Sequence, residues 1–161
     1  MEGKALKKSL EEVRNLKKDR PPLFGLMQDR PLMISSILGH AAAFNGAREI
    51  VSRNRDGSFE RYGFAALDRR ARALAAALTR LGVRQGDRIA TLAWNTRRHL
   101  EIFYGAPCMG AVLHTINPRL FEDQIVYIAN HAEDRILFFD ADLYDLVARL
   151  APRLASIKRF V

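Results

Sequence analysis

The sequence predicts an α/β protein in which a layered parallel sheet is flanked by helices and preceded by an amino-terminal β-hairpin. From Tyr62 onward, short strand-like runs alternate with helical patterns, the order that right-handed βαβ crossovers produce. Earlier in the chain, Asp56-Gly57 separates two β-like runs and marks a hairpin turn. The run Arg88–Trp94 is short and mostly apolar, as expected of a parallel strand buried on both faces.

The individual elements follow from hydrophobic spacing and from the turn residues between them. Helices are expected over Met1–Lys18, Ile34–Phe44, Phe64–Leu81, Asn95–Tyr104, Glu122–Asn130 and Ala141–Leu150. Strands are expected over Glu49–Arg53, Ser58–Tyr62, Arg88–Trp94, Ala111–Thr115, Arg135–Phe139 and Ser156–Val161.

The helix over Phe64–Leu81 has the clearest pattern. Its apolar residues form one stripe, made of Leu67, Ala71, Leu74, Ala75, Leu78 and Leu81. Gly63 stands at the N-cap position, and Gly82 stands where a left-handed residue ends a helix. In the helix that Asn95 or Thr96 begins, we expect Leu100, Phe103 and Tyr104 to face the core, and Pro107 and Gly110 to end the helix.

Two segments differ in composition. Five of the six lysines fall within the first 18 residues, whereas arginine dominates afterwards. We therefore expect residues 1–21 to be an amphipathic helical extension of uncertain origin, and residues 22–161 to be a partial domain. The extension can be native, a tag or a misassigned start, with Met27 as another candidate start. The chain ends in a strand-like run, so truncation of the domain at its carboxyl end is also expected.

Composition narrows the class of partner. The net charge is +8 and the pI is about 10.1, but the arginines are mixed with acids and no aromatic residues are interleaved with them. We expect a solvated surface and no nucleic-acid partner. Membrane contact is not favoured, because no apolar run approaches a bilayer span and no secretory signal is visible. The expected location is the cytoplasm. The single cysteine, Cys108, is expected to be a buried, unreactive thiol.

No residue is assigned a catalytic, cofactor-binding or metal-binding role. His114 lies on a predicted strand without a carboxylate nearby in the sequence, and His131 lies at a helix carboxyl terminus, so both are interpreted as structural. The ten glycines are scattered and form no phosphate-binding loop. No Cys, His or Asp cluster has the spacing of metal ligands.

The runs Gly110–Leu120 and Ile128–Asp134 carry a family resemblance. They read GAVLHTINPRL and IANHAED. With Gly82-Val83, Gly86–Ala90, Asn95 and Glu101, they resemble the amino-terminal lobe of AMP-forming acyl-CoA synthetases of the adenylate-forming superfamily. The subgroup most similar is the medium- or long-chain fatty-acid and methylthiopropionate CoA ligases. Gly63 departs from the family, which usually has Ser or Thr at that helix start.

The resemblance implies a parent enzyme that joins a carboxylic acid to coenzyme A through an acyl-AMP intermediate. Such an enzyme uses ATP, CoA and Mg²⁺. In the family, the phosphate loop, the magnesium-binding glutamate and the catalytic lysine follow the region that resembles this chain. We therefore expect these 161 residues to bind none of the three and to be inactive alone. A homodimer is possible. Two other interpretations remain open: a non-catalytic α/β adaptor or binding module, and an adenylate-forming relative with another acid substrate.

Overall fold

The computed structural model describes Gly25 and residues 31–161 of the chain. The helix predicted over Met1–Lys18 and the boundary predicted at Pro21-Pro22 lie outside the described residues. The elements discussed below all lie in the unit Leu32–Val161.

This unit alternates helices and strands as expected. Its α-helices are α2 (Ile34–Asn45), α3 (Phe64–Arg80), α4 (Arg97–Cys108), α5 (Glu122–His131) and α6 (Tyr144–Leu150). Its strands are β1 (Glu49–Arg53), β2 (Phe59–Gly63), β3 (Arg88–Leu92), β4 (Val112–Ile116), β5 (Ile136–Phe139) and β6 (Arg159–Phe160). Two short 3₁₀ turns, Ala141–Leu143 and Ala151–Arg153, flank α6.

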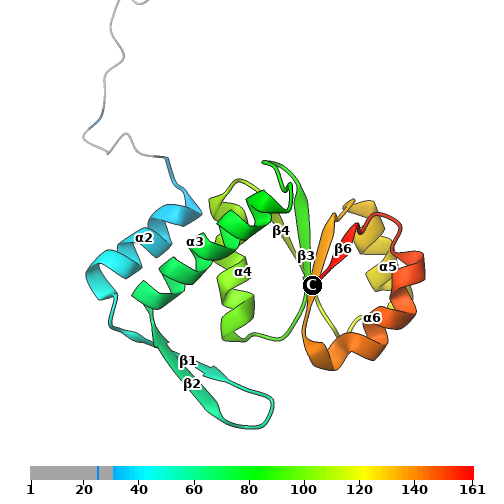
Figure 1. Ribbon diagram of the computed structural model, residues 1–161, viewed down its shortest axis with the longest axis horizontal. Coiled ribbons are helices and arrows are strands. Elements are labelled where there is room, and N and C mark those ends of the chain that lie inside the picture. Colours follow the sequence, from blue (N-terminus) through cyan, green and yellow to red (C-terminus); the bar gives the residue numbers. More distant parts are fainter. Residues whose placement is uncertain (1–24, 26–30) are drawn as a thin grey trace, which may run out of the picture. The chain divides into compact units, whose positions relative to one another are not determined.

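Strands β3 to β6 form one parallel sheet in the order β4-β3-β5-β6. The chain runs from β3 outward to β4 and then crosses back over β3 to reach β5. The β3–β4 connection and the β4–β5 connection run across the sheet in opposite directions. Because both carry a helix, α4 and α5 cover opposite faces of the sheet (Figure 1). The predicted layered α/β architecture is confirmed.

The sheet is buried on both faces, and β3 lies at its centre. Ile89 points to the face covered by α3 and α4, where it packs with Leu78 and Ala106. Its neighbour Ala90 points the other way, into the cluster that α5 and α6 complete. Four of the five residues of β3 are buried, which explains why this strand reads as an unbroken apolar run.

The hairpin of β1 and β2 is antiparallel and forms a separate two-stranded sheet. The Asp56 carboxylate accepts a hydrogen bond of 2.9 Å from the backbone N–H of Ser58, and Gly57 adopts φ +84°. The predicted Asp-Gly turn is therefore confirmed. At its base, the hairpin packs Ile50 and Tyr62 against a third core cluster built around Leu67 of α3.

Gly63 shows why this chain lacks Ser or Thr at the start of α3. The Gly46 carbonyl oxygen accepts a 3.0 Å hydrogen bond from the Ala65 N–H, so a backbone group satisfies a donor that a side-chain cap would otherwise take. A Cβ atom on Gly63 would overlap that same oxygen. The close approach of the two backbones requires glycine.

Three local expectations were wrong. Helix α4 runs through Pro107 to Cys108, because a proline in the last turn removes only one intrahelical hydrogen bond. Gly110, with φ +86°, follows the helix end as expected. Cys108 is exposed rather than buried. Of the three α4 residues expected to face the core, Phe103 is 43% exposed, whereas Leu100 and Tyr104 are half-buried and pack against the Leu67 cluster. The fully buried face of α4 carries Glu101, Ile102, Gly105 and Ala106.

The stripe on α3 is confirmed for its central residues and ends earlier than expected. Leu67, Ala71 and Leu78 are buried, and Leu81 lies beyond the last turn and is 40% exposed. The reason is that α3 ends at Arg80 and Gly82, with φ +82°, redirects the chain after Leu81.

Gly63→Ala should lower the free energy of unfolding by about 1–3 kcal/mol, because the new methyl group must displace the Gly46 carbonyl. Gly39→Ala is the matched control, since Gly39 lies within α2 and a Cβ there meets nothing within 4 Å. That substitution should raise stability by about 0.5–1 kcal/mol. Denaturant midpoints of the three proteins measure both effects. Equal changes in the two variants would contradict the proposed close contact.

Candidate functional site

A cleft of about 820 Å³ opens at the carboxyl ends of β3 and β4. The loop after β3 leads to α4 on one face of the sheet, and the loop after β4 leads to α5 on the other face. Loops that diverge in this way leave a crevice between them, which is where open α/β sheets bind ligands. The sheet order therefore positions this cleft.

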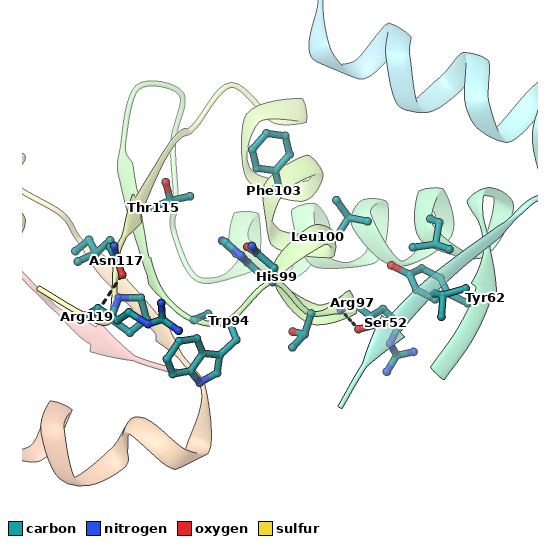
Figure 2. Close-up of a pocket in the computed structure, with 17 residues that line it drawn as sticks. Ser52, Tyr62, Trp94, Arg97, His99, Leu100, Phe103, Thr115, Asn117 and Arg119 are labelled. Atoms are coloured by element: carbon teal, nitrogen blue, oxygen red, sulfur yellow. Dashed lines mark hydrogen bonds between the residues drawn. The ribbon is translucent and has the colours of Figure 1, made fainter. Parts of the chain in front are cut away.

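Three stretches of chain line the cleft. The hairpin contributes Ile50, Val51, Ser52 and Tyr62; the end of β3 and the start of α4 contribute residues 93–97, His99, Leu100 and Phe103; the end of β4 contributes residues 115–119. Figure 2 shows these side chains converging from the hairpin on one side and from the β4 turn on the other.

Trp94 is held at one side of the cleft. Its backbone N–H donates a 2.7 Å hydrogen bond to Asp140, and its indole N–H donates a 2.9 Å bond to Asp142. The Arg119 guanidinium lies 6.0 Å from the centre of the indole ring, at the outer limit of a cation–π contact. The turn that carries Arg119 is closed by Asn117, whose side-chain oxygen accepts a 3.0 Å bond from the Arg119 N–H.

His99 lies at the centre of the cleft in Figure 2. Its Nε2 is 3.1 Å from the hydroxyl of Thr91, a buried residue of β3. Burial lowers the pKa of the His99 imidazole, although the charge of Asp140 opposes the shift. A neutral imidazole has one donor and one acceptor nitrogen, so His99 can hydrogen-bond a polar group of a bound molecule.

Two buried hydroxyl groups of the cleft have no hydrogen-bond partner among the described residues. They are the Tyr62 hydroxyl and the Thr96 hydroxyl. Burial raises the pKa of Tyr62, with the charge of Glu101 adding to the shift, so the phenol stays protonated and can donate. Thr96 is the N-cap residue of α4 but makes no side-chain cap, and the first turn carries Arg97, Arg98 and His99 and no acid. The cleft thus combines apolar walls with positive potential and unused donors.

His114 has a carboxylate partner that is distant in the sequence. No carboxylate lies near it in the chain, but the fold brings Asp134, twenty residues further on, to 2.7 Å from its Nδ1. Asp134 is fully buried, and its second oxygen has no hydrogen-bond partner among the described residues. The pair ties the edge strand β4 to the connection between α5 and β5. It lies outside the cleft.

His131, the other histidine considered in the sequence, likewise contacts a residue of the protein scaffold. His131 is the last residue of α5, as predicted, and its ring stacks on Tyr127 at 5.5 Å between ring centres. Within residue 25 and residues 31–161, no group of three or more His, Cys, Asp or Glu side chains could hold a metal ion. In the same part of the chain, every helix is too short or too polar to cross a bilayer.

Comparison with known proteins identifies the class. Residues 38–159 match the model of the AMP-binding enzyme family, so this chain belongs to that family. It is 52% identical over 139 residues to the 3-methylmercaptopropionyl-CoA ligase of Ruegeria lacuscaerulensis. It is 43% identical over the same length to the medium-chain-fatty-acid–CoA ligase of Ectopseudomonas oleovorans. Each match covers 86% of this chain and 26% of the relative.

Solved structures agree with this assignment. The fold superimposes on a Mycobacterium tuberculosis fatty acyl CoA synthetase with a TM-score of 0.67 and 25% sequence identity, over 80% of this chain and 26% of the other. An anthranilate CoA ligase in complex with anthranoyl-AMP shares the fold with a TM-score of 0.71. The resemblance to AMP-forming acyl-CoA synthetases is confirmed, and the chain spans about a quarter of the length of these ligases.

Asp134→Asn should change stability in a pH-dependent way. Burial raises the pKa of the Asp134 carboxyl above 3.8, and the hydrogen bond to His114 only partly offsets this. The protonated form therefore favours folding: its contribution is full below 3.8 and is lost as pH rises through the folded pKa. Denaturant unfolding over a pH series should show the wild type losing stability relative to Asp134→Asn as pH rises.

Asp56→Asn is the control with the opposite sign. Hydrogen bonds from the Ser58 hydroxyl and backbone hold the pKa of the Asp56 carboxyl below 3.8. The ionised form favours folding, so the wild type should gain stability relative to this variant as pH rises. A difference between wild type and Asp134→Asn that is flat with pH, or that has the same sign as this control, would refute the role given to burial of Asp134.

Proposed function

We propose that this chain forms the amino-terminal part of an AMP-forming acyl-CoA ligase. The observation that supports the proposal most strongly is the 52% identity, over 139 residues, to a ligase that forms a CoA thioester. In the proposed reaction, the substrate carboxylate attacks the α-phosphorus of ATP and releases pyrophosphate. The CoA thiolate then attacks the acyl carbon of acyl-AMP and releases AMP.

The described residues are proposed to supply the scaffold and one binding cleft. A carboxylic acid with an apolar tail, ATP and CoA all carry negative charge. The cleft offers these molecules Arg119, the amino terminus of α4 and hydroxyl donors that have no hydrogen-bond partner in the described part of the chain, beside apolar side chains. Mg²⁺ is part of the proposal for the whole enzyme, but the described residues offer it no ligand set, so no step is assigned to it here.

The substrate class follows from the relatives. We propose a carboxylic acid of the 3-methylmercaptopropionate or fatty-acid type, because the similar ligases are named for 3-methylmercaptopropionate and for medium-chain and long-chain fatty acids. The cytoplasmic location and a possible homodimer stay predictions.

An exchange experiment tests the activity. The segment of the Ruegeria lacuscaerulensis ligase that matches this chain is replaced by the matching 139 residues, and pyrophosphate release is measured with 3-methylmercaptopropionate, a medium-chain fatty acid and acetate. The chimera should turn over at least one of the first two. The 161-residue chain alone should release no pyrophosphate above background. A folded chimera inactive with all three acids would favour the interpretation as a non-catalytic module.

Arg119→Ala should weaken binding of one phosphate-bearing substrate. In the active chimera we expect the KM of either CoA or ATP to rise about tenfold, which corresponds to about 1.4 kcal/mol for a lost charge-assisted contact, with little change in kcat. Arg53→Ala is the control, because Arg53 is exposed and does not line the cleft. If the KM values of both CoA and ATP are unchanged in Arg119→Ala, Arg119 does not contribute to binding either substrate.

A further inference from the structure

The hairpin of β1 and β2 needs support from the rest of the unit. It is a two-stranded sheet, which is marginally stable in water by itself. Val51 is 48% exposed, so one face of β1 is not covered. Support at the base comes from Ile50 and Tyr62, which pack beside the Leu67 cluster. The polar support comes largely from one residue of α4.

Arg97 contacts both strands of the hairpin. Its backbone N–H donates a 3.0 Å hydrogen bond to the hydroxyl of Ser52 on β1 (Figure 2). Its Nε lies 3.2 Å from the carboxylate of Glu60 on β2, a charge contact that lacks hydrogen-bond geometry. Its guanidinium carbon lies 5.8 Å from the centre of the Tyr62 ring. Ser52 is one of few buried polar residues among those described, at 6% exposed.

The position of Arg97 is not explained by helix formation. A cation in the first turn of a helix is disfavoured by the helix dipole, and Arg97 lies directly after the N-cap of α4. Its side chain is only 21% exposed, between Glu60 and Glu101, whereas the adjacent Arg98 is exposed. Glu101 is also paired with Arg70 of α3. Arg97 thus joins the hairpin to an ion network that spans α3 and α4.

A second ion pair, Arg55 with Asp142, connects the hairpin tip to the 3₁₀ turn after β5. The Arg55 side chain is 67% exposed, so solvent and salt weaken this contact. The less exposed contacts of Arg97 are screened less. They should therefore dominate the polar part of the hairpin's attachment.

The same contacts form part of the cleft. Ser52, Tyr62 and Arg97 all line it, so movement of the hairpin away from α4 would remove one wall. We propose that Arg97 is a positioning residue that holds the β1–β2 hairpin as the closed wall of the cleft, and that release of its side chain opens the cleft. That the cleft receives a substrate of the ligase reaction rests on the proposed function; the attachment of the hairpin does not.

Hydrogen exchange of the 161-residue chain tests the attachment. In Arg97→Gln, amides of β1 and β2 should exchange about tenfold faster than in wild type, with exchange in β3 and β5 unchanged. Arg97→Lys should lie between them, because lysine keeps the charge near Glu60 but loses the planar group over Tyr62. Arg98→Gln is the matched control and should leave the hairpin unchanged.

Two results would overturn the proposal. One is unchanged exchange in the hairpin of Arg97→Gln; the other is equal acceleration in all strands, which indicates general loss of stability. If Arg97→Gln does not fold, Glu60→Gln replaces it, because that change removes the carboxylate on β2 that faces the Arg97 Nε. Faster exchange confined to the hairpin of Glu60→Gln supports the attachment, and no difference from wild type rejects it.

The active chimera provides a separate test of the link to substrate binding. Arg97→Gln should raise the KM of the acid or of CoA several-fold more than it changes kcat, and Arg97→Lys should restore part of the difference. Equal losses in kcat and kcat/KM would reject the link. Because the exchange experiment needs no catalysis, an inactive chimera would count against the proposed function and leave the attachment to be judged by exchange alone.

Discussion

The burial of β3 on both faces is the constraint on which the rest of the unit depends. A strand at the centre of a parallel sheet must be covered twice, and the chain meets this requirement by sending α4 to one face and α5 to the other. That division separates the loops at the carboxyl ends of β3 and β4. The cleft is therefore a consequence of how the core is covered, and its walls come from residues that also begin α4 and close the turn after β4.

Elements whose signals are local could be predicted from the sequence. The Asp56-Gly57 hairpin, the α3 stripe and the short apolar strands each occupy one continuous stretch, where spacing and turn chemistry are sufficient. The buried face of α4 was assigned only in part, because it contains Glu101. In a sequence, a glutamate is interpreted as a surface residue unless a partner for its charge is known. The partner of Glu101 is Arg70, which lies 31 residues earlier on another helix.

The candidate site was not predictable in the same way. Asn95 was interpreted only as a residue that begins a helix, and the structure places it beside the cleft, together with Asn117, which closes a turn. What the sequence could not give was the strand order, which alone decides that the ends of β3 and β4 meet. For the same reason, the partner of His114 became visible only when α5 brought Asp134 back to the sheet. The family resemblance supplied the class of enzyme without these contacts.

Trp94 gives the cleft an optical property. It is the only tryptophan of the chain. Its indole is fixed by Asp142 on one side and approached by Arg119 on the other, so its surroundings are charged and well defined. Indole emission responds to nearby charge and to water, and the intrinsic fluorescence of this protein arises from tryptophan at one place, the wall of the cleft. A ligand that enters there changes the emission without any attached dye, and quenching by iodide or acrylamide reports how open the cleft is.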